Sequence, residues 1–336
     1  MQVRNVFHVV DLHAGGEPLR IVVDGYPPVP GATMLDRRQY VQEHWDPWRR
    51  RILWEPWGHR DLYGCLLLPP ERAQSLYGLL FMHNAGYSTM SGHAVIAVAK
   101  MLVETGRVPR DPSSADVVIP LDVPSGQVVA HAVLDAGGVD SVWFESVPAF
   151  ARALDVDVNV DGLRITLDVG YGGAFYAVVP AESLGLSLTP GGVPALRQWA
   201  ARIRVAVESR LSLEVPGAPR IAGLHGTLFT EEPRGLDHAG RQTTVFADGQ
   251  VDRSPGGSGI TARLAILAAR GRWAVGVDFP VEGLLDTVFT GRILGPGPDL
   301  GPYPTVRTTV SGRAHIIAFR RFFEDPNDPV APFLIR

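Results

Sequence analysis

The chain has 336 residues, of which 46% are hydrophobic and 20% charged, and its formal net charge is −4 at pH 7. This length favours two domains of roughly 150 residues each, and the slight negative charge offers no broad basic surface for nucleic acid. No apolar run reaches the roughly 18 residues of a membrane span, no leader is evident at the N-terminus, and the single lysine, Lys100, disfavours lysine-dependent cofactor chemistry.

Short β-like runs fill much of the chain between its 37 glycines and 28 prolines. One of these runs carries the only cysteine, Cys65, which we expect to be a buried structural thiol. A single cysteine forms no internal disulfide and suits a reducing compartment, so we expect a cytoplasmic protein. The predicted strands span 7–10, 19–23, 62–68, 79–83, 117–119, 128–133, 163–168, 175–179, 243–246, 287–289, 306–310 and 315–319.

Three helices are predicted, over 92–105, 194–213 and 257–270. The first is apolar around nearly its whole circumference and should be buried inside a domain. The middle one carries a single apolar stripe, which indicates a surface helix. Its stripe consists of Leu196, Trp199, Ala200, Ile203 and Val207, and the residues expected to face solvent are Arg197, Arg202, Arg204 and Glu208. The arginine run 49–51 is typical of a solvated helix end.

The loop-to-helix unit at 91–107 recurs without a gap at 256–272, and glycine follows each helix as the expected stop. The identical pairs are Gly92/Gly257, Ala97/Ala262, Leu102/Leu267, Gly106/Gly271 and Arg107/Arg272. This duplication predicts an α/β (α+β) fold of two pseudo-symmetric domains, each a β-sheet or barrel wrapped around a central helix. We place 1–125 plus 305–336 in the first domain and 126–304 in the second, with both helix N-termini aimed at the interdomain cleft.

The two helix starts carry the chemistry. A helix N-terminus presents unpaired N–H groups and the positive end of the helix dipole, so two of them facing one cleft could clamp a small anion. Gly92, Gly257 and Gly259 allow close backbone approach, although turns and caps alone also use glycine. Asp252 and His93 offer a carboxylate for a substrate ammonium and an imidazole for proton handling; the alternatives are a turn former and a core histidine.

Ser91 precedes the first helix and Gly256 stands at the equivalent point of the second. Capping would explain the serine. As a proton acceptor it would need activation by His93, by the helix dipole and by exclusion of water. The sequence contains no Gly-x-Ser-x-Gly motif, and its histidines lack the spacing of a zinc site, so we expect no metal. The scattered histidines are His8, His13, His44, His59, His83 and His131.

Five ordered motifs, at 11–18, 55–64, 82–93, 171–176 and 251–259, resemble the proline racemase family. That family includes proline racemases, 4-hydroxyproline 2-epimerases and trans-3-hydroxy-L-proline dehydratases. The resemblance implies a cofactor-independent enzyme of the diaminopimelate-epimerase-like fold, with the active site between two pseudo-symmetric domains. It also implies a small imino-acid substrate, and a homodimer is a further expectation.

In the racemases and epimerases a cysteine stands at each helix start, one on either face of the substrate Cα. Here those positions are Ser91 and Gly256. The resemblance further implies that the backbone at Gly92-His93 and Gly257-Ser258 binds the substrate carboxylate, and that Asp252 with His93 holds the ring nitrogen. Departures from the usual family residues that bear on the pocket walls are Ala14 for threonine, Trp57 for arginine and Leu62 for methionine.

The missing thiols favour elimination over racemisation. Racemisation needs a proton donor on the face opposite the acceptor, whereas elimination needs one base at Cα and a leaving group on Cβ. We therefore expect dehydration of trans-3-hydroxy-L-proline to Δ1-pyrroline-2-carboxylate, with Ser91 taking the α-proton. Two alternatives stay open: a 4-hydroxyproline 2-epimerase or proline racemase-like isomerase, with water or a nearby side chain in place of the second thiol, and a degenerate imino-acid-binding homologue.

Overall fold

A computed structural model describes residues 4–111 and 114–335. One half of the fold, which includes the N-terminal strands and the last strand of the chain, contains helices α1 (Met34–His44), α2 (Asp46–Leu53) and α3 (Gly92–Glu104). Its strands are β1 (Arg4–Ala14), β2 (Glu17–Asp24), β3 (Tyr63–Leu68), β4 (Tyr77–His83), β5 (Gly86–Ser88), β6 (Asp116–Val123), β7 (Gly126–Asp135), β8 (Gly138–Glu145) and β20 (Ala314–Glu324).

The second half contains the long helix α4 (Val193–Arg210), the central helix α5 (Gly257–Ala269) and two short 3₁₀ turns, η1 (Ala181–Leu184) and η2 (Pro190–Gly192). A small separate hairpin joins β12 (Glu214–Val215) to β13 (Ala218–Ala222). The remaining strands are β9 (Phe150–Val160), β10 (Leu163–Tyr171), β11 (Phe175–Pro180), β14 (Leu224–Glu231), β15 (Gly240–Phe246), β16 (Gln250–Val251), β17 (Asp278–Glu282), β18 (Val288–Pro296) and β19 (Val306–Gly312).

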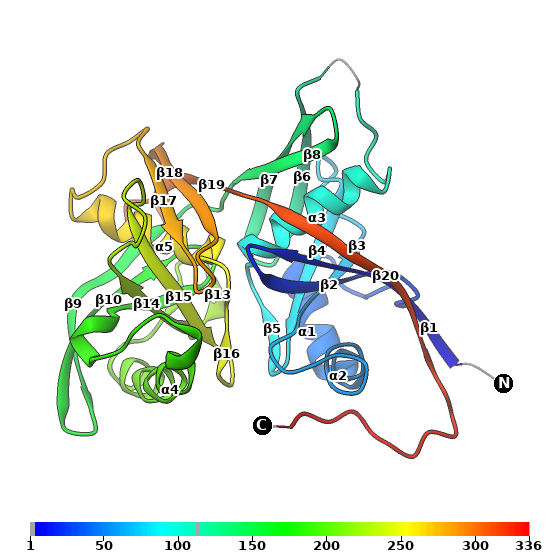
Figure 1. Cartoon of the computed structure of the whole chain (residues 1–336), viewed down its shortest axis with the longest axis horizontal. Coiled ribbons are helices and arrows are strands. Elements are labelled where there is room, and N and C mark those ends of the chain that lie inside the picture. The colour runs from blue at the N-terminus through cyan, green and yellow to red at the C-terminus, as the bar shows by residue number, and fades with distance from the viewer. Residues whose placement is uncertain (1–3, 112–113, 336) are drawn as a thin grey trace.

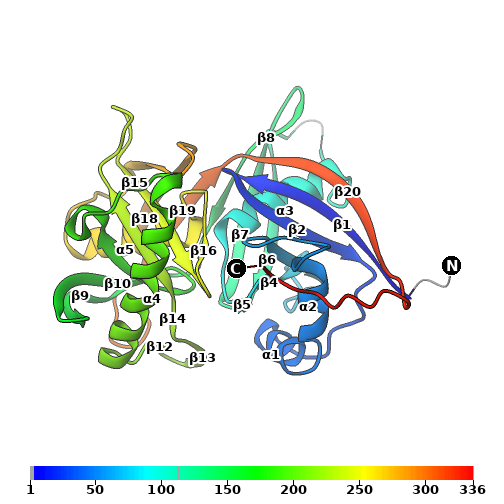
Figure 2. The ribbon, with the colours of Figure 1, turned by 60° about the horizontal axis from the view of Figure 1, so that its bottom comes forward.

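Strand pairing repeats the same order in both halves. The first ladder runs β20-β1-β2-β3-β4-β6-β7-β8 and the second runs β9-β10-β11-β14-β15-β17-β18-β19, with the same parallel and antiparallel steps. β8 pairs with β19, so the two ladders form one continuous sheet. The halves lie side by side, and the chain passes between them after β8 and again after β19 (Figures 1 and 2). The expected two-part α/β fold is confirmed.

The pairing order bears on where the halves divide. A boundary at 125/126 would assign β7 and β8 to the second half, yet both strands pack against α3 and extend the first ladder. We therefore propose that β1–β8 with β20 form one domain and β9–β19 the other. Sequence alone could not place this boundary, because consecutive hairpins of one sheet look the same on either side of it.

The two central helices match their prediction closely. In α3 every residue except Lys100 and Glu104 is buried, and α5 is buried over its first ten residues except Arg263. Gly106 and Gly271 follow them with left-handed φ of +69° and +64°, as helix-stopping glycines do. The thiol of Cys65 is buried as expected.

Some surface expectations were wrong. Arg49 is buried rather than solvated, because its guanidinium pairs with Asp46 and donates to the carbonyl of His83. Helix α4 buries the predicted stripe except Trp199, which is partly buried. Arg197 and Arg204 are only partly exposed, because Arg197 donates to the carbonyl of Gly249 and Arg204 donates to two carbonyls of β14. Among the described residues, no helix is both long and apolar enough to cross a membrane.

Candidate active site

Helices α3 and α5 meet at their N-terminal glycines. A Cβ on Gly92 would lie 2.5 Å from Gly257 Cα, and a Cβ on Gly257 would lie 2.7 Å from Gly92 Cα. Real Cβ atoms do not approach so closely, so both positions require glycine for the same reason. The repeated glycine therefore marks the point where the two halves of the duplication touch.

A small cavity of about 20 Å³ lies at this meeting point. It is roughly the space of one ordered water, so an imino acid needs the surrounding groups to move apart before it fits. All the residues predicted for the site line it: Ser91, Gly92, His93, Asp252, Gly256, Gly257 and Ser258. The wall residues that sequence reasoning did not assign to the site include Tyr63, Met90, Tyr176, His225, Thr244 and Phe246.

Both helices present unsatisfied backbone amides to the cavity. The first amide of α3 that bonds back along the helix is that of Val95, which donates to Ser91 at 3.1 Å. In α5 it is that of Ile260, which donates to Gly256 at 2.9 Å. The three preceding amides of each first turn have no intrahelical acceptor, and no N-cap side chain binds them, since the Ser91 hydroxyl does not cap α3 and Gly256 has no side chain. Two helix dipoles thus direct positive potential at one point, which suits a carboxylate.

Ser91 is buried and does not cap its helix. Its backbone is extended, and its hydroxyl lies 3.2 Å from Nδ1 of His93 instead of bonding to a first-turn amide. Burial, with the positive charge of Arg253 as a smaller effect, lowers the pKa of His93 to about 3. The imidazole is therefore neutral at pH 7, and with its proton on Nε2 it can accept the proton of Ser91 through Nδ1.

Asp252 places a second polar side chain, a carboxylate, in the wall of the same cavity. Its Oδ1 accepts the amide (2.9 Å) and the hydroxyl (2.7 Å) of Ser254. A Cβ on Gly256 would lie 3.0 Å from Asp252 Oδ2, so this oxygen borders the position where a second catalytic side chain would stand. Burial raises the pKa of Asp252 to about 6, with Ser254 and Arg253 opposing that rise.

Two buried tyrosines complete the polar lining. Tyr176 exchanges a hydrogen bond of 2.6 Å with Ser258, and the Tyr63 ring stands edge-on to His93 with their centroids 4.9 Å apart. Burial raises the pKa of both phenols, and the nearby hydroxyls of Ser88 and Ser91 oppose this for Tyr63. Both therefore keep their protons at neutral pH and act as hydrogen-bond donors or acceptors rather than as charges.

The segment 252–256 is held from both sides. Gln242 and Thr243, on β15, donate to the carbonyls of Pro255 and Asp252. On the other side, the amide of Leu284 donates to the carbonyl of Arg253, and a Cβ on Gly283 would lie 2.8 Å from that same oxygen.

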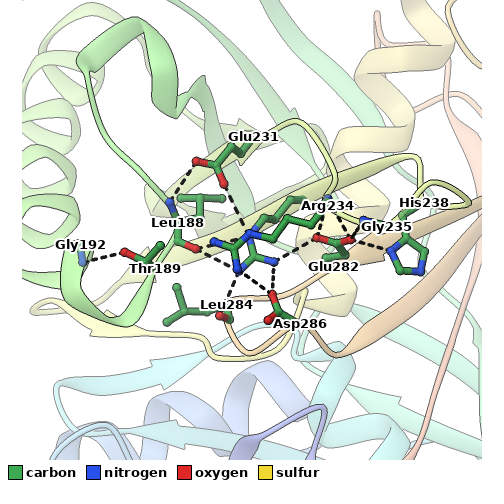
Figure 3. Close-up of polar contacts among 11 residues, drawn as sticks. Leu188, Thr189, Gly192, Glu231, Arg234, Gly235, His238, Glu282, Leu284 and Asp286 are labelled. Carbon is green, nitrogen blue, oxygen red and sulfur yellow. Dashed lines mark hydrogen bonds and ion pairs between the residues drawn. The ribbon is translucent and has the colours of Figure 1, made fainter.

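A buried polar network anchors the turn that carries Leu284. The fully buried guanidinium of Arg241 donates to the carbonyls of Leu188 and Leu284 and pairs with Glu282 and Asp286. Glu282 also accepts from His238 and from two backbone amides, as the close-up of this network shows (Figure 3). Burial raises the pKa of Glu282, but these donors outweigh it and hold the pKa at about 2.

Part of the site was within reach of sequence reasoning. Tyr63 and Tyr176 lie in the motif segments 55–64 and 171–176. These motifs indicate the family, but they assign no role to either phenol. His225 and Thr244 lie on β14 and β15 outside every motif, and nothing in the sequence marks them. Within the described residues, no three histidine, cysteine, aspartate or glutamate side chains gather as metal ligands do.

The comparisons with known proteins agree with this layout. The sequence model of the family described as "Proline racemase" matches residues 9–332. Trans-3-hydroxy-L-proline dehydratase of Bacillus thuringiensis subsp. konkukian is 39% identical over 328 residues, which cover 98% of this chain and 97% of that protein. The human trans-3-hydroxy-L-proline dehydratase is 39% identical over 333 residues, covering 97% and 93%.

A solved structure extends the agreement to three dimensions. The hydroxyproline epimerase from Agrobacterium vitis, with bound trans-4-OH-L-proline, matches with a TM-score of 0.93 at 28% identity. The match covers 100% of this chain and 96% of that one. The chain belongs to the proline racemase family.

Proposed function

We propose that this protein is a trans-3-hydroxy-L-proline dehydratase. One observation carries the proposal: the cavity has a buried hydroxyl, Ser91, at one helix start and no side chain, Gly256, at the other. Such a site has one proton acceptor at Cα and no thiol opposite it. It is therefore suited to elimination, which needs one base, more than to racemisation, which needs two groups. The dehydratases that are 39% identical to the chain support the same assignment.

The charges of the site match an imino acid. The amides at Gly92-His93 and Gly257-Ser258 would bind the carboxylate at the positive ends of both helices. Asp252, ionised above its pKa of about 6, would bind the ring ammonium. Neutral His93 adds no competing positive charge at neutral pH.

The elimination requires Ser91 to accept the α-proton. As the Cα–H bond breaks, Ser91 takes that proton while its own proton passes to Nδ1 of His93, 3.2 Å away. The electron pair forms the Cα=Cβ bond and the C3–O bond breaks. The leaving hydroxide takes a proton from Ser91, and Ser91 recovers its own proton from His93, so water departs and the site returns to its starting state. The resulting enamine tautomerises to Δ1-pyrroline-2-carboxylate. The neutral phenols of Tyr63 and Tyr176 are candidate hydrogen-bond donors to the departing oxygen.

One observation favours a second candidate, a hydroxyproline epimerase. Asp252 Oδ2 borders the space beside Gly256, and a carboxyl with a pKa near 6 can carry a proton. Protonated Asp252 could then deliver a proton to the face opposite Ser91. Incubation with trans-4-hydroxy-L-proline in deuterium oxide decides this: deuterium at Cα with inversion supports the epimerase, and its absence excludes it.

The main proposal is tested by incubating the protein with trans-3-hydroxy-L-proline and measuring pyrroline-2-carboxylate by coupled reduction. Turnover that is lost in Ser91→Ala supports the proposal. No turnover, with stabilisation by pyrrole-2-carboxylate alone, would support a degenerate binding protein instead. The double change Ser91→Cys with Gly256→Cys restores both thiols, and epimerase activity gained only in that variant supports the one-base account. Gly256 has a φ of +76°, so this second cysteine requires its loop to adjust.

A cytoplasmic location and a homodimer belong to the same proposal. The single thiol of Cys65 suits a reducing compartment. Size-exclusion chromatography with light scattering tests the dimer: a mass near twice the 36.3 kDa of the chain is expected.

A further inference from the structure

A second, larger cavity lies beside the site. Its volume is about 250 Å³, and His225 lines both this outer cavity and the inner one. Its walls come from both halves of the chain: Arg38 on α1, and Arg204 and Glu208 on α4. Because His225 lines both cavities, it stands between them. Its ring stacks on that of Phe246, with centroids 5.3 Å apart.

Arg38 has an unusual environment for an arginine. No ion pair among the described residues includes it, and its one protein acceptor is the carbonyl of Tyr87, at 3.1 Å. Burial lowers the pKa of Arg38, which is the direction expected for a cation that has lost water without gaining a carboxylate. A partly buried cation without a carboxylate partner loses some of its hydration, and an anion in the cavity would offset that cost.

The rest of the outer cavity adds positive potential. Arg204 donates to the carbonyls of Leu224 and His225 at 2.7 and 2.8 Å. Burial, then the charges of Arg204 and Arg38, lowers the pKa of His225 to about 3, so this wall is uncharged at pH 7. Glu208 is the one acidic side chain among the described lining residues, and it lies 4.0 Å from Arg204. The cavity therefore carries a net positive charge beside an apolar wall that includes Phe175 and Leu224.

We propose that the outer cavity is a vestibule in which Arg38 binds the carboxylate of the imino acid before the molecule passes His225 into the inner cavity. The proposal rests on the proposed function, because it takes the occupant to be the same substrate. A guanidinium offers a carboxylate two parallel N–H donors, and the apolar wall suits the pyrrolidine ring. The vestibule would raise the rate of association, as electrostatic steering does, while the inner site sets the dissociation rate.

Stopped-flow binding of pyrrole-2-carboxylate tests this. In Arg38→Gln the association rate constant should fall by about fivefold or more, with the dissociation rate constant nearly unchanged. Added salt should slow association in the wild type and have less effect in this variant. Arg38→Lys should recover part of the rate. Arg107→Gln is the matched control, since it removes the same charge from an exposed residue at the far end of α3.

A second variant guards against loss of folding in Arg38→Gln. Glu208→Gln keeps the oxygen that accepts from the Leu224 amide but removes the acidic charge, so it should raise the association rate constant. If the wild type binds pyrrole-2-carboxylate and both variants have the same association rate constant as the wild type, the vestibule proposal is overturned and the proposed function is unaffected. No binding of pyrrole-2-carboxylate to the wild type would overturn both.

Discussion

Replacing Asp252 by asparagine should stabilise the free protein while weakening substrate binding. Asp252 is 7% exposed, and burial raises its pKa from 3.8 to about 6. The charge of Asp252 in turn adds to burial in raising the pKa of the fully buried Glu17. Asparagine preserves the shape of the side chain and an oxygen for the two bonds from Ser254, but it carries no charge to desolvate.

The size of the effect follows from the shift in pKa. Because the folded-state pKa exceeds the unfolded one, the folded protein binds the extra proton between about pH 4 and 6. The penalty is absent below about pH 4 and complete above about pH 6. A shift of about two units corresponds to about 3 kcal/mol, so Asp252→Asn should raise the free energy of unfolding by up to that amount at pH 7.5. The gain should shrink as the pH falls and vanish near pH 4.

Chemical denaturation of wild type and variant at pH 4, 5, 6 and 7.5 measures this. Asp140→Asn is the matched control, because the hydrogen bond from Arg313 lowers the pKa of that partly exposed aspartate and its loss should not stabilise the protein. Titration with L-proline should show weaker binding by Asp252→Asn. A variant that is less stable than the wild type at pH 7.5, or equally stable at every pH, would refute the reasoning.

Three further predictions follow from the same contacts. Gly92→Ala should destabilise the protein by about 1–3 kcal/mol and abolish turnover, because its Cβ would meet the Gly257 backbone. Gly86→Ala is the control and should do neither, since its Cβ would make an ordinary contact of 3.7 Å. Thermal unfolding and the activity assay compare the two variants. The pH profile of kcat/KM should fall about tenfold per pH unit below pH 6, as Asp252 gains its proton, and a profile flat down to pH 5 would contradict that role. Arg241→Lys should raise KM by about tenfold with a smaller change in kcat, because it loosens the turn that supports segment 252–256; an unchanged KM in the folded variant would contradict this.

The central helices and the residues at their starts were predictable because the signals are local. A run that is apolar on all sides, such as that around Ile96, requires burial wherever it lies. Its repetition at Ile260, with glycines at both ends, doubles the signal. The position of Ser91 opposite Gly256 then follows from the duplication.

Other features depend on contacts between distant segments. Helix α1 buries only Met34 and Val41, so its sequence shows no apolar stripe to predict it. Arg49 is buried because carbonyls of residues more than thirty positions away accept its hydrogen bonds. His225 reaches the cavity from the middle of a sheet, and Arg38 faces the outer cavity only because the two halves meet there.

The most direct test of the central claim is the initial rate at which purified protein forms Δ1-pyrroline-2-carboxylate from trans-3-hydroxy-L-proline, compared with the rate for Ser91→Ala. In the proposed mechanism Ser91 is the side chain that accepts the α-proton. The account predicts turnover by the wild type and a loss of at least about a hundredfold in the variant, with folding unchanged. Equal rates in the two proteins, or no product from the wild type, would contradict it.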